Sequence, residues 1–103
     1  MLSVIKSLFG LGPKVNYKEL MQRGAVIIDV RSKGEFASGH IKGAKNIPLD
    51  VLGNNLNGLD KSKPVITCCA SGMRSGAAKG MLKSKGFNEV HNGGAWVSLN
   101  NKI

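Results

Sequence analysis

Two adjacent cysteines followed by a glycine-containing turn are the residues of this sequence best suited to chemistry. Cys68 and Cys69 end an apolar run, and the segment from Ala70 to Ser75 leads from them into a helical pattern. Backbone N–H groups in such a turn, together with the dipole of the helix that follows, stabilise an anion. A helix N-terminus also lowers the pKa of a cysteine, and the thiolate is its nucleophilic form. The pattern therefore predicts a reactive thiol at this junction of strand and helix.

Strand geometry distinguishes the two thiols. Neighbouring side chains of a strand point to opposite faces of the sheet, so only one of the pair can face the turn. We expect Cys69, which adjoins the turn, to be the catalytic nucleophile, and Cys68 to be packed inertly in the core. The alternative for Cys69 is an unreactive buried side chain, a common environment for free cysteine.

The elements that must position this loop alternate between strand and helix patterns. Apolar runs predict strands over 25–30, 45–47, 64–68 and 88–91. Capping signals and apolar spacing predict helices that begin after Asn16, cover 33–38, begin at Asp50 and cover 74–85. Such alternation favours parallel pairing through right-handed crossovers. The predicted class is α/β: a small doubly wound sheet of about five mostly parallel strands flanked by helices.

Length and charge favour one domain with anionic partners. The 103 residues suffice for a single hydrophobic core. Fifteen Lys and Arg against six Asp and Glu give a formal charge of +9, which attracts anions at long range. The five aromatic residues are scattered and form no stacking platform. We therefore expect no nucleic acid, and the charge is compatible with a small anionic ligand or an acidic protein. A solvated surface that keeps a small protein soluble is the interpretation of the charge that we favour.

The cysteines and the N-terminal segment bear on compartment. Two adjacent cysteines have the spacing of neither a disulfide framework nor a zinc site, so we expect no metal and a reducing, cytoplasmic location. Residues 1–11 are too short an apolar stretch to span a bilayer, and they lack the features of a secretory signal. We expect a short helix over residues 1–14 and a domain over 15–103 that is a monomer. Peripheral membrane contact through the first segment is the alternative.

Three motifs in order resemble the rhodanese family of sulfurtransferases. Residues 69–75, Cys-Ala-Ser-Gly-Met-Arg-Ser, resemble the family's active-site loop, Cys-x-x-Gly-x-Arg-Ser. Residues 28–48 resemble its N-terminal signature, with Ile-Asp-Val-Arg at the start and Asn-Ile-Pro at the end. Gly93 and Gly94 followed by Trp96 resemble its C-terminal signature. The resemblance implies a rhodanese-like fold over most of the chain.

The resemblance also implies a reaction. A family member's cysteine takes a sulfane sulfur from thiosulfate, a polysulfide or a persulfide, becomes a persulfide, and passes the sulfur to a thiol, a protein or cyanide. The family's reaction requires no metal and no organic cofactor. Carried over to this sequence, catalysis falls to Cys69. Binding of the substrate and the persulfide falls to the loop residues Ala70, Ser71, Gly72, Met73, Arg74 and Ser75.

Several side chains keep a second interpretation. Arg74 either braces the loop, which we favour, or binds an anionic donor. Ser75 either caps the helix or donates to the persulfide. Trp96 either forms a pocket wall or packs in the core. His40 is expected to orient its turn rather than to catalyse.

Two other functions fit parts of the sequence. Cys68 and Arg74 satisfy Cys-x5-Arg, the pattern of low-molecular-weight phosphatases and arsenate reductases. That loop counts seven residues, wide enough for a tetrahedral oxyanion, whereas the loop counted from Cys69 holds six and suits a single sulfur atom. A non-catalytic protein-docking or sulfur-carrier module is the other alternative.

Overall fold

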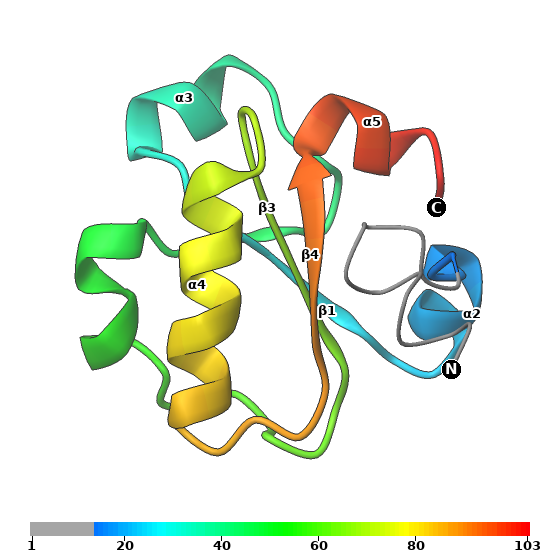
Figure 1. The fold of residues 1–103 in the computed structure, drawn as a ribbon. Helices are drawn as coiled ribbons and strands as arrows, with labels where there is room; N and C mark the ends of the chain where they lie inside the picture. Colours follow the sequence, from blue (N-terminus) through cyan, green and yellow to red (C-terminus); the bar gives the residue numbers. More distant parts are fainter. Residues whose placement is uncertain (1–13) are drawn as a thin grey trace, which may run out of the picture.

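One parallel sheet with helices on both faces makes up the computed structural model, which describes residues 14–103 (Figure 1). The strands are β1 (Val26–Asp29), β2 (Lys45–Asn46), β3 (Val65–Cys69) and β4 (Val90–Ala95). The helices are α2 (Tyr17–Gln22), α3 (Lys33–Ser38), α4 (Met73–Ser84), α5 (Trp96–Asn100) and the 3-10 helix η1 (Leu49–Asn54). The strand order is β2-β1-β3-β4, and every neighbouring pair is parallel. The predicted α/β class is confirmed, with four strands in the described part where the sequence predicts about five.

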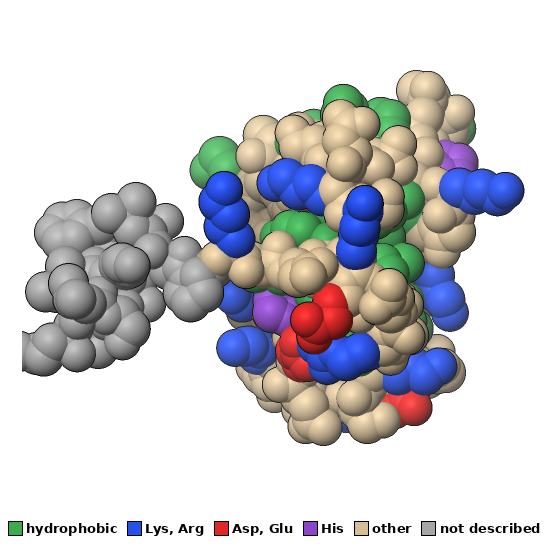
Figure 2. Space-filling view, turned by 90° about the vertical axis from the view of Figure 1, so that its right-hand side faces the viewer, with side chains coloured by type: hydrophobic (Ala, Val, Ile, Leu, Met, Phe, Trp, Pro, Cys, Tyr) green, Lys and Arg blue, Asp and Glu red, His purple; other side chains and the backbone are tan. Residues whose placement is uncertain are grey.

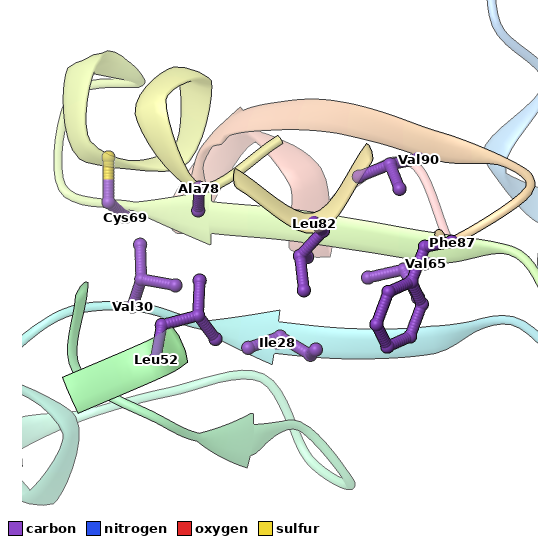
Figure 3. Packing of buried hydrophobic residues seen from close by; sticks show 9 residues of the cluster. All are labelled: Ile28, Val30, Leu52, Val65, Cys69, Ala78, Leu82, Phe87 and Val90. Carbon is purple, nitrogen blue, oxygen red and sulfur yellow. The ribbon is translucent and has the colours of Figure 1, made fainter. Parts of the chain in front are cut away.

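Both faces of the central strands are buried, as their unbroken apolar sequences predict. One face of the sheet packs against α4 and η1, and the other against α2 and α5. The first core cluster is shown in Figure 3 and contains Ile28, Val30, Leu52, Val65, Cys69, Ala78, Leu82, Phe87 and Val90. The second contains Leu20, Ile27, Ile41, Ile66, Cys68 and Leu99. The two cysteines therefore lie on opposite faces of β3, as strand alternation predicts.

Side-chain caps begin two of the helices where the sequence predicts them. The Asn16 side chain accepts a hydrogen bond from the Glu19 amide at the start of α2 (3.1 Å). At the start of α3, the Ser32 hydroxyl accepts from the Glu35 amide (3.2 Å) while the Glu35 carboxylate accepts from the Ser32 amide (3.1 Å). This reciprocal capping box fixes the beginning of α3, whose bounds match the prediction.

The region after β2 differs from the prediction. Asp50 does not cap a helix: it lies in the first turn of η1, whose N-cap is Pro48 and which has no side-chain cap. The turn begins directly after Pro48, whose backbone is extended (φ −55°, ψ 144°), so Asp50 already lies inside the turn and cannot take the non-helical conformation of an N-cap.

The C-terminal part also differs. The last strand does not end at residue 91 but runs on to Ala95, and α5 follows it directly. A register shift opposite Thr67 and Cys69 inserts one extra residue into β4, so Gly93 and Gly94 lie inside the strand. A Cβ on Gly93 would lie 2.8 Å from Ile66 and Leu99 side-chain atoms, so glycine is what allows the strand to pass there.

The N-terminal helix predicted over residues 1–14 falls almost wholly outside the described residues. Between residues 14 and 103, no helix combines the length and apolar character required to cross a membrane.

Candidate active site

Cys69 is the last residue of β3, at the carboxyl edge of the sheet. The turn that follows leads into α4 and lies beside α3 and the tip of β4 (Figure 1). Cys69 has no exposed surface. In Figure 3 its sulfur points away from Val30 and Leu52, toward the turn at the start of α4. Open parallel sheets form their sites at this edge, where loops lead into helix N-termini.

Hydrogen-bond groups surround the Cys69 sulfur. The Gly72 amide donates to Sγ at 2.9 Å and the Ser75 amide at 3.4 Å. The Ser75 hydroxyl oxygen lies 3.3 Å from Sγ. Gly72 has a φ of +102°, in the left-handed region that favours glycine, and it is the N-cap residue of α4. The backbone conformation of the turn therefore aims its amides at the sulfur.

The pKa of Cys69 is set by two opposing effects. Burial raises it, because a charged sulfur is poorly solvated there. Hydrogen bonds from the Ser75 hydroxyl and from the amides of Ser75, Gly72 and Ser71 lower it. The hydrogen bonds prevail, and the pKa of Cys69 lies below its ordinary value.

Cys68 has the opposite environment. It is fully buried in the second core cluster, paired in register with Asp29. Burial, followed by the negative charge of Asp29, raises the pKa of the Cys68 thiol to about 12. At neutral pH this thiol is protonated and enclosed, whereas Cys69 faces hydrogen-bond donors.

Arg74 is held by a carboxylate on α3. Its guanidinium donates two hydrogen bonds to Glu35, at 2.7 and 2.9 Å, and joins the first turn of α4 to the capping box of α3. The Arg74 hydrogen bond lowers the pKa of Glu35 to about 2, and the Ser32 amide contributes further. These contacts fit the bracing interpretation of Arg74. In the same loop Ala70 and Ser71 are exposed, and Met73 is 83% exposed.

A polar network behind the loop was missed by reasoning from sequence. Asn92 of β4 accepts a hydrogen bond from the Ser75 hydroxyl (2.6 Å) and donates one to the Gly72 carbonyl (3.1 Å). The Thr67 hydroxyl donates to the Ser75 carbonyl (2.8 Å). The signal for Asn92 is its place directly before two glycines, since a bulge there turns a side chain out of the regular alternation.

Trp96 and His40 have structural contacts. The Trp96 ring is partly buried, lies 4.9 Å from the Arg31 guanidinium and packs against Gly39. Arg31 in turn forms a buried ion pair with Asp29 (2.7 Å). The His40 ring stacks on Phe36 and bonds through Nδ1 to the Phe36 carbonyl (2.7 Å).

A cavity of about 670 Å³ lies beside the loop. Its apolar lining consists of Val30, Pro48, Leu49 and Val51, and its polar lining of Ser32, Lys33, Asp50 and Arg74. Trp96 does not line this cavity. The cavity therefore adjoins the loop through Arg74.

Residues 14–96 match the family model of the rhodanese-like domain. The chain belongs to the rhodanese-like domain family. The match includes the loop and all four strands of the described part. The resemblance in the three motifs is therefore confirmed for the family and the fold.

Relatives of this rhodanese-like domain include an uncharacterized protein and proteins named as thiosulfate sulfurtransferases. It is 44% identical over 70 residues to the uncharacterized protein YqhL of Bacillus subtilis (strain 168), covering 68% of this chain but only 56% of that protein. It is 33% identical over 79 residues to the thiosulfate sulfurtransferase GlpE of Pseudomonas fluorescens (strain SBW25), covering 77% of this chain and 72% of that protein. Names of this kind support a rhodanese-type enzyme at the level of the family.

Solved structures show the same fold. A rhodanese from E. coli aligns with a TM-score of 0.68 at 33% identity, over 72% of this chain and 89% of that one. The human single-domain sulfurtransferase TSTD1 aligns with a TM-score of 0.73 at 27% identity, over 84% of this chain and 91% of that one.

Proposed function

We propose that this domain is a sulfurtransferase in which Cys69 carries the transferred sulfur as a persulfide. The observation that supports this most strongly is the set of polar groups around one thiol: the Gly72 and Ser75 amides donate to Sγ at 2.9 and 3.4 Å, and the Ser75 hydroxyl oxygen lies 3.3 Å from it. They lower the pKa of Cys69, so at a given pH more of this thiol is ionised than of an ordinary cysteine. The neighbouring Cys68 has none of these advantages.

The proposed reaction has two displacements at sulfur. The Cys69 thiolate attacks the outer sulfur of thiosulfate, a polysulfide or a persulfide. A new S–S bond forms, the donor's S–S bond breaks, and the donor leaves with the electron pair, as sulfite in the case of thiosulfate. An acceptor thiolate or cyanide then attacks the outer sulfur, and Cys69 leaves as thiolate. The loop from Ala70 to Ser75 stabilises negative charge on the persulfide through its amides.

The phosphatase and arsenate reductase interpretation has less support. It needs Cys68 as nucleophile, but that side chain lies in the core on the opposite face of β3 from the loop, with a pKa raised to about 12. It also needs a free guanidinium from Arg74, which is engaged by Glu35. A docking module or a sulfur carrier would use the same fold, but the docking module would take up no sulfur and the carrier would pass its sulfur only to a protein.

Sulfur uptake by each thiol tests the proposal directly. After incubation with thiosulfate or a polysulfide, intact-protein mass spectrometry should show the gain of one sulfur atom, removed again by cyanide. Cys69→Ser should abolish the gain. Cys68→Ser is the matched control and should retain it, because it changes the adjacent residue without touching the loop. Uptake that depends on Cys68 would contradict the assignment.

Turnover assays separate the remaining alternatives. Sulfur transfer to cyanide or to a thiol should be catalytic with at least one donor, and the ratio of rates among donors would identify the donor class. Hydrolysis of para-nitrophenyl phosphate that disappears in Cys68→Ser would establish the phosphatase instead. A Cys69 persulfide that forms but is discharged only to a protein would indicate a carrier. Monomeric state and cytoplasmic location stay predictions.

A further inference from the structure

Two hydrogen bonds with the backbone fix the orientation of the Asn92 side-chain amide. Its Oδ1 accepts from the Gly94 amide at 2.9 Å, and its Nδ2 donates to the Gly72 carbonyl at 3.1 Å. Exchanging oxygen and nitrogen would set two donors against each other at Gly94 and two acceptors against each other at Gly72. The atom that faces Ser75 is therefore the carbonyl oxygen of the amide.

This orientation determines where the Ser75 proton points. Oδ1 carries no proton, so the Ser75 hydroxyl is the donor in the 2.6 Å contact with Asn92. A hydroxyl has a single proton to donate. While that proton points at Asn92, the Ser75 oxygen offers only a lone pair to the Cys69 sulfur 3.3 Å away. Such an arrangement suits the Cys69 thiol, whose own proton can be donated to Ser75.

A thiolate reverses the requirement. A charged sulfur is stabilised by a donor and repelled by a lone pair, so the Ser75 proton must turn from Asn92 to Cys69 when the thiol ionises. Hydrogen bonds to charged groups are stronger than hydrogen bonds between neutral groups, and this favours rotation of the Ser75 hydroxyl toward the thiolate. The 2.6 Å bond to Asn92 is lost in exchange.

We propose that Asn92 is a positioning residue that competes with the Cys69 thiolate for the Ser75 proton, and so limits how far the loop stabilises the thiolate. The proposal rests on the proposed function, in which Cys69 is the reactive thiol. A less stabilised thiolate is a stronger nucleophile. When Sγ forms its bond to the transferred sulfur, it loses its charge. The Ser75 proton then returns to Asn92. The hydrogen bond between Ser75 and Asn92 therefore favours the persulfide over the free thiolate.

The fold places Asn92 for this role. The register shift in β4 occurs between Asn92, paired with Thr67, and Ala95, paired with Cys69. Within the extra length, Gly94 has a φ of +76° and turns its amide back onto Asn92 Oδ1. Bulges of this kind redirect side chains next to active sites. The result is an amide held by backbone on both sides and aimed at a buried serine.

The test is the pH dependence of Cys69 alkylation by iodoacetamide in Asn92→Leu. Asn92 is exposed, and leucine has the branching of asparagine but accepts no hydrogen bond. We expect the pKa of Cys69 to fall by about half a pH unit to one unit, the equivalent of one hydrogen bond freed for the sulfur. If Asn92 merely held the loop through Gly72, the same substitution would raise the pKa, because the Gly72 amide would be less well aimed.

A second background makes the test specific. In Ser75→Ala the contested proton is absent, so adding Asn92→Leu to that variant should produce no fall in the pKa of Cys69. Asn100→Leu, the same substitution at an exposed position of α5, is the control and should leave the pKa unchanged. The groups that interact electrostatically with Cys69 are Arg74, which is paired with Glu35, and the buried Cys68, and these variants leave Arg74, Glu35 and Cys68 in place.

The outcomes separate this proposal from the proposed function. A raised or unchanged pKa in Asn92→Leu, or an equal fall in the Ser75→Ala background, would overturn the role of Asn92. Alkylation measures the thiol and not the reaction, so a pKa shift of the expected sign without sulfur uptake would overturn the sulfurtransferase and leave the role of Asn92 standing. Failure of Cys69 to alkylate at any accessible pH would overturn both.

Discussion

Adjacent cysteines in one strand acquire opposite chemistry because the two faces of the sheet differ at their ends. The Cys68 side chain enters a closed apolar core next to Asp29, and burial raises its pKa to about 12. The Cys69 side chain reaches the edge of the sheet, where the chain turns into α4 and presents its amides. A shift of one residue along β3 is enough to convert an inert thiol into a candidate nucleophile.

The first prediction concerns pH. Because the pKa of Cys69 lies below its ordinary value, the rate of sulfur uptake should rise with pH and reach its plateau at a lower pH than for a free cysteine. Ser75→Ala removes the hydroxyl that donates to the thiolate, so the rising part of the profile should move to higher pH. The measurement is uptake rate against pH by mass spectrometry. A profile that does not move would show that the backbone amides alone set the pKa.

At the scale of elements, the extra residue in β4 is the feature that brings strand, loop and helix together. Gly93 passes between Ile66 and Leu99, and a Cβ on it would lie 2.8 Å from each of their side chains and 2.9 Å from the Thr67 carbonyl oxygen. No side-chain movement relieves the contact with backbone. A larger residue at this position would therefore force the backbone to shift.

The second prediction compares two glycines. Gly93→Ala should lower the free energy of unfolding by about 1–3 kcal/mol, as overpacking does, and should displace Asn92 from the loop. Gly80→Ala is the matched substitution on the exposed side of α4, where a Cβ meets nothing within 4 Å. It should raise stability by about 0.5–1 kcal/mol, since glycine is unfavourable inside a helix. Denaturant unfolding of both variants measures the contrast, and equal effects would contradict the packing argument.

The third prediction concerns the link between α3 and α4. The Arg74 hydrogen bond and the Ser32 amide lower the pKa of Glu35 from 4.5 to about 2. A carboxylate whose pKa is lowered on folding stabilises the fold above its unfolded pKa, and this stabilisation is lost as the pH falls toward 2. Glu35→Gln should therefore be less stable than the parent at neutral pH, and the difference should shrink between about pH 4.5 and pH 2.

Unfolding midpoints in urea at a series of pH values measure this difference. Asp50→Asn on the neighbouring η1 is the control, since Asp50 forms no salt bridge within residues 14–103. A difference that stays constant down to pH 2 would show that Glu35 acts through its capping geometry and not through its charge.

Local sequence patterns predicted most of these helices and strands, and contacts between residues far apart in the sequence explain the rest. Unbroken apolar runs gave β1 and β3, and the Ser32 and Glu35 spacing gave α3, because the residues involved are neighbours in sequence. The course of β4 depends on how Gly93 fits against Ile66, which no local pattern encodes. The same holds for the site: motif and alternation single out Cys69, but Asn92 reaches Ser75 across 17 residues of sequence through a bulge.

Charge is distributed over the whole molecule in a way that composition alone does not show. All three arginines pair with carboxylates: Arg23 with Glu19 and Glu89, Arg31 with Asp29, and Arg74 with Glu35. Within residues 14–103 no lysine forms such a pair. Figure 2 shows basic side chains spread over the face that carries α2 and α5, with few acidic ones between them. The net charge of +9 is therefore carried by lysines, which are spread over the face shown in Figure 2; three of them, Lys14, Lys18 and Lys102, line one pocket.

The fourth prediction follows from that dispersion. Lysines spread over the surface attract an anion from all directions, but salt screens this attraction beyond about 8–10 Å at physiological ionic strength. With Arg74 held by Glu35, little of the attraction comes from the loop itself. For thiosulfate, a dianion, kcat/KM should fall several-fold from low to physiological salt while kcat stays nearly constant. For an uncharged dialkyl trisulfide neither should change. If thiosulfate transfer were insensitive to salt, binding would have to depend on a local cation, and Arg74 would then be a substrate ligand rather than a brace.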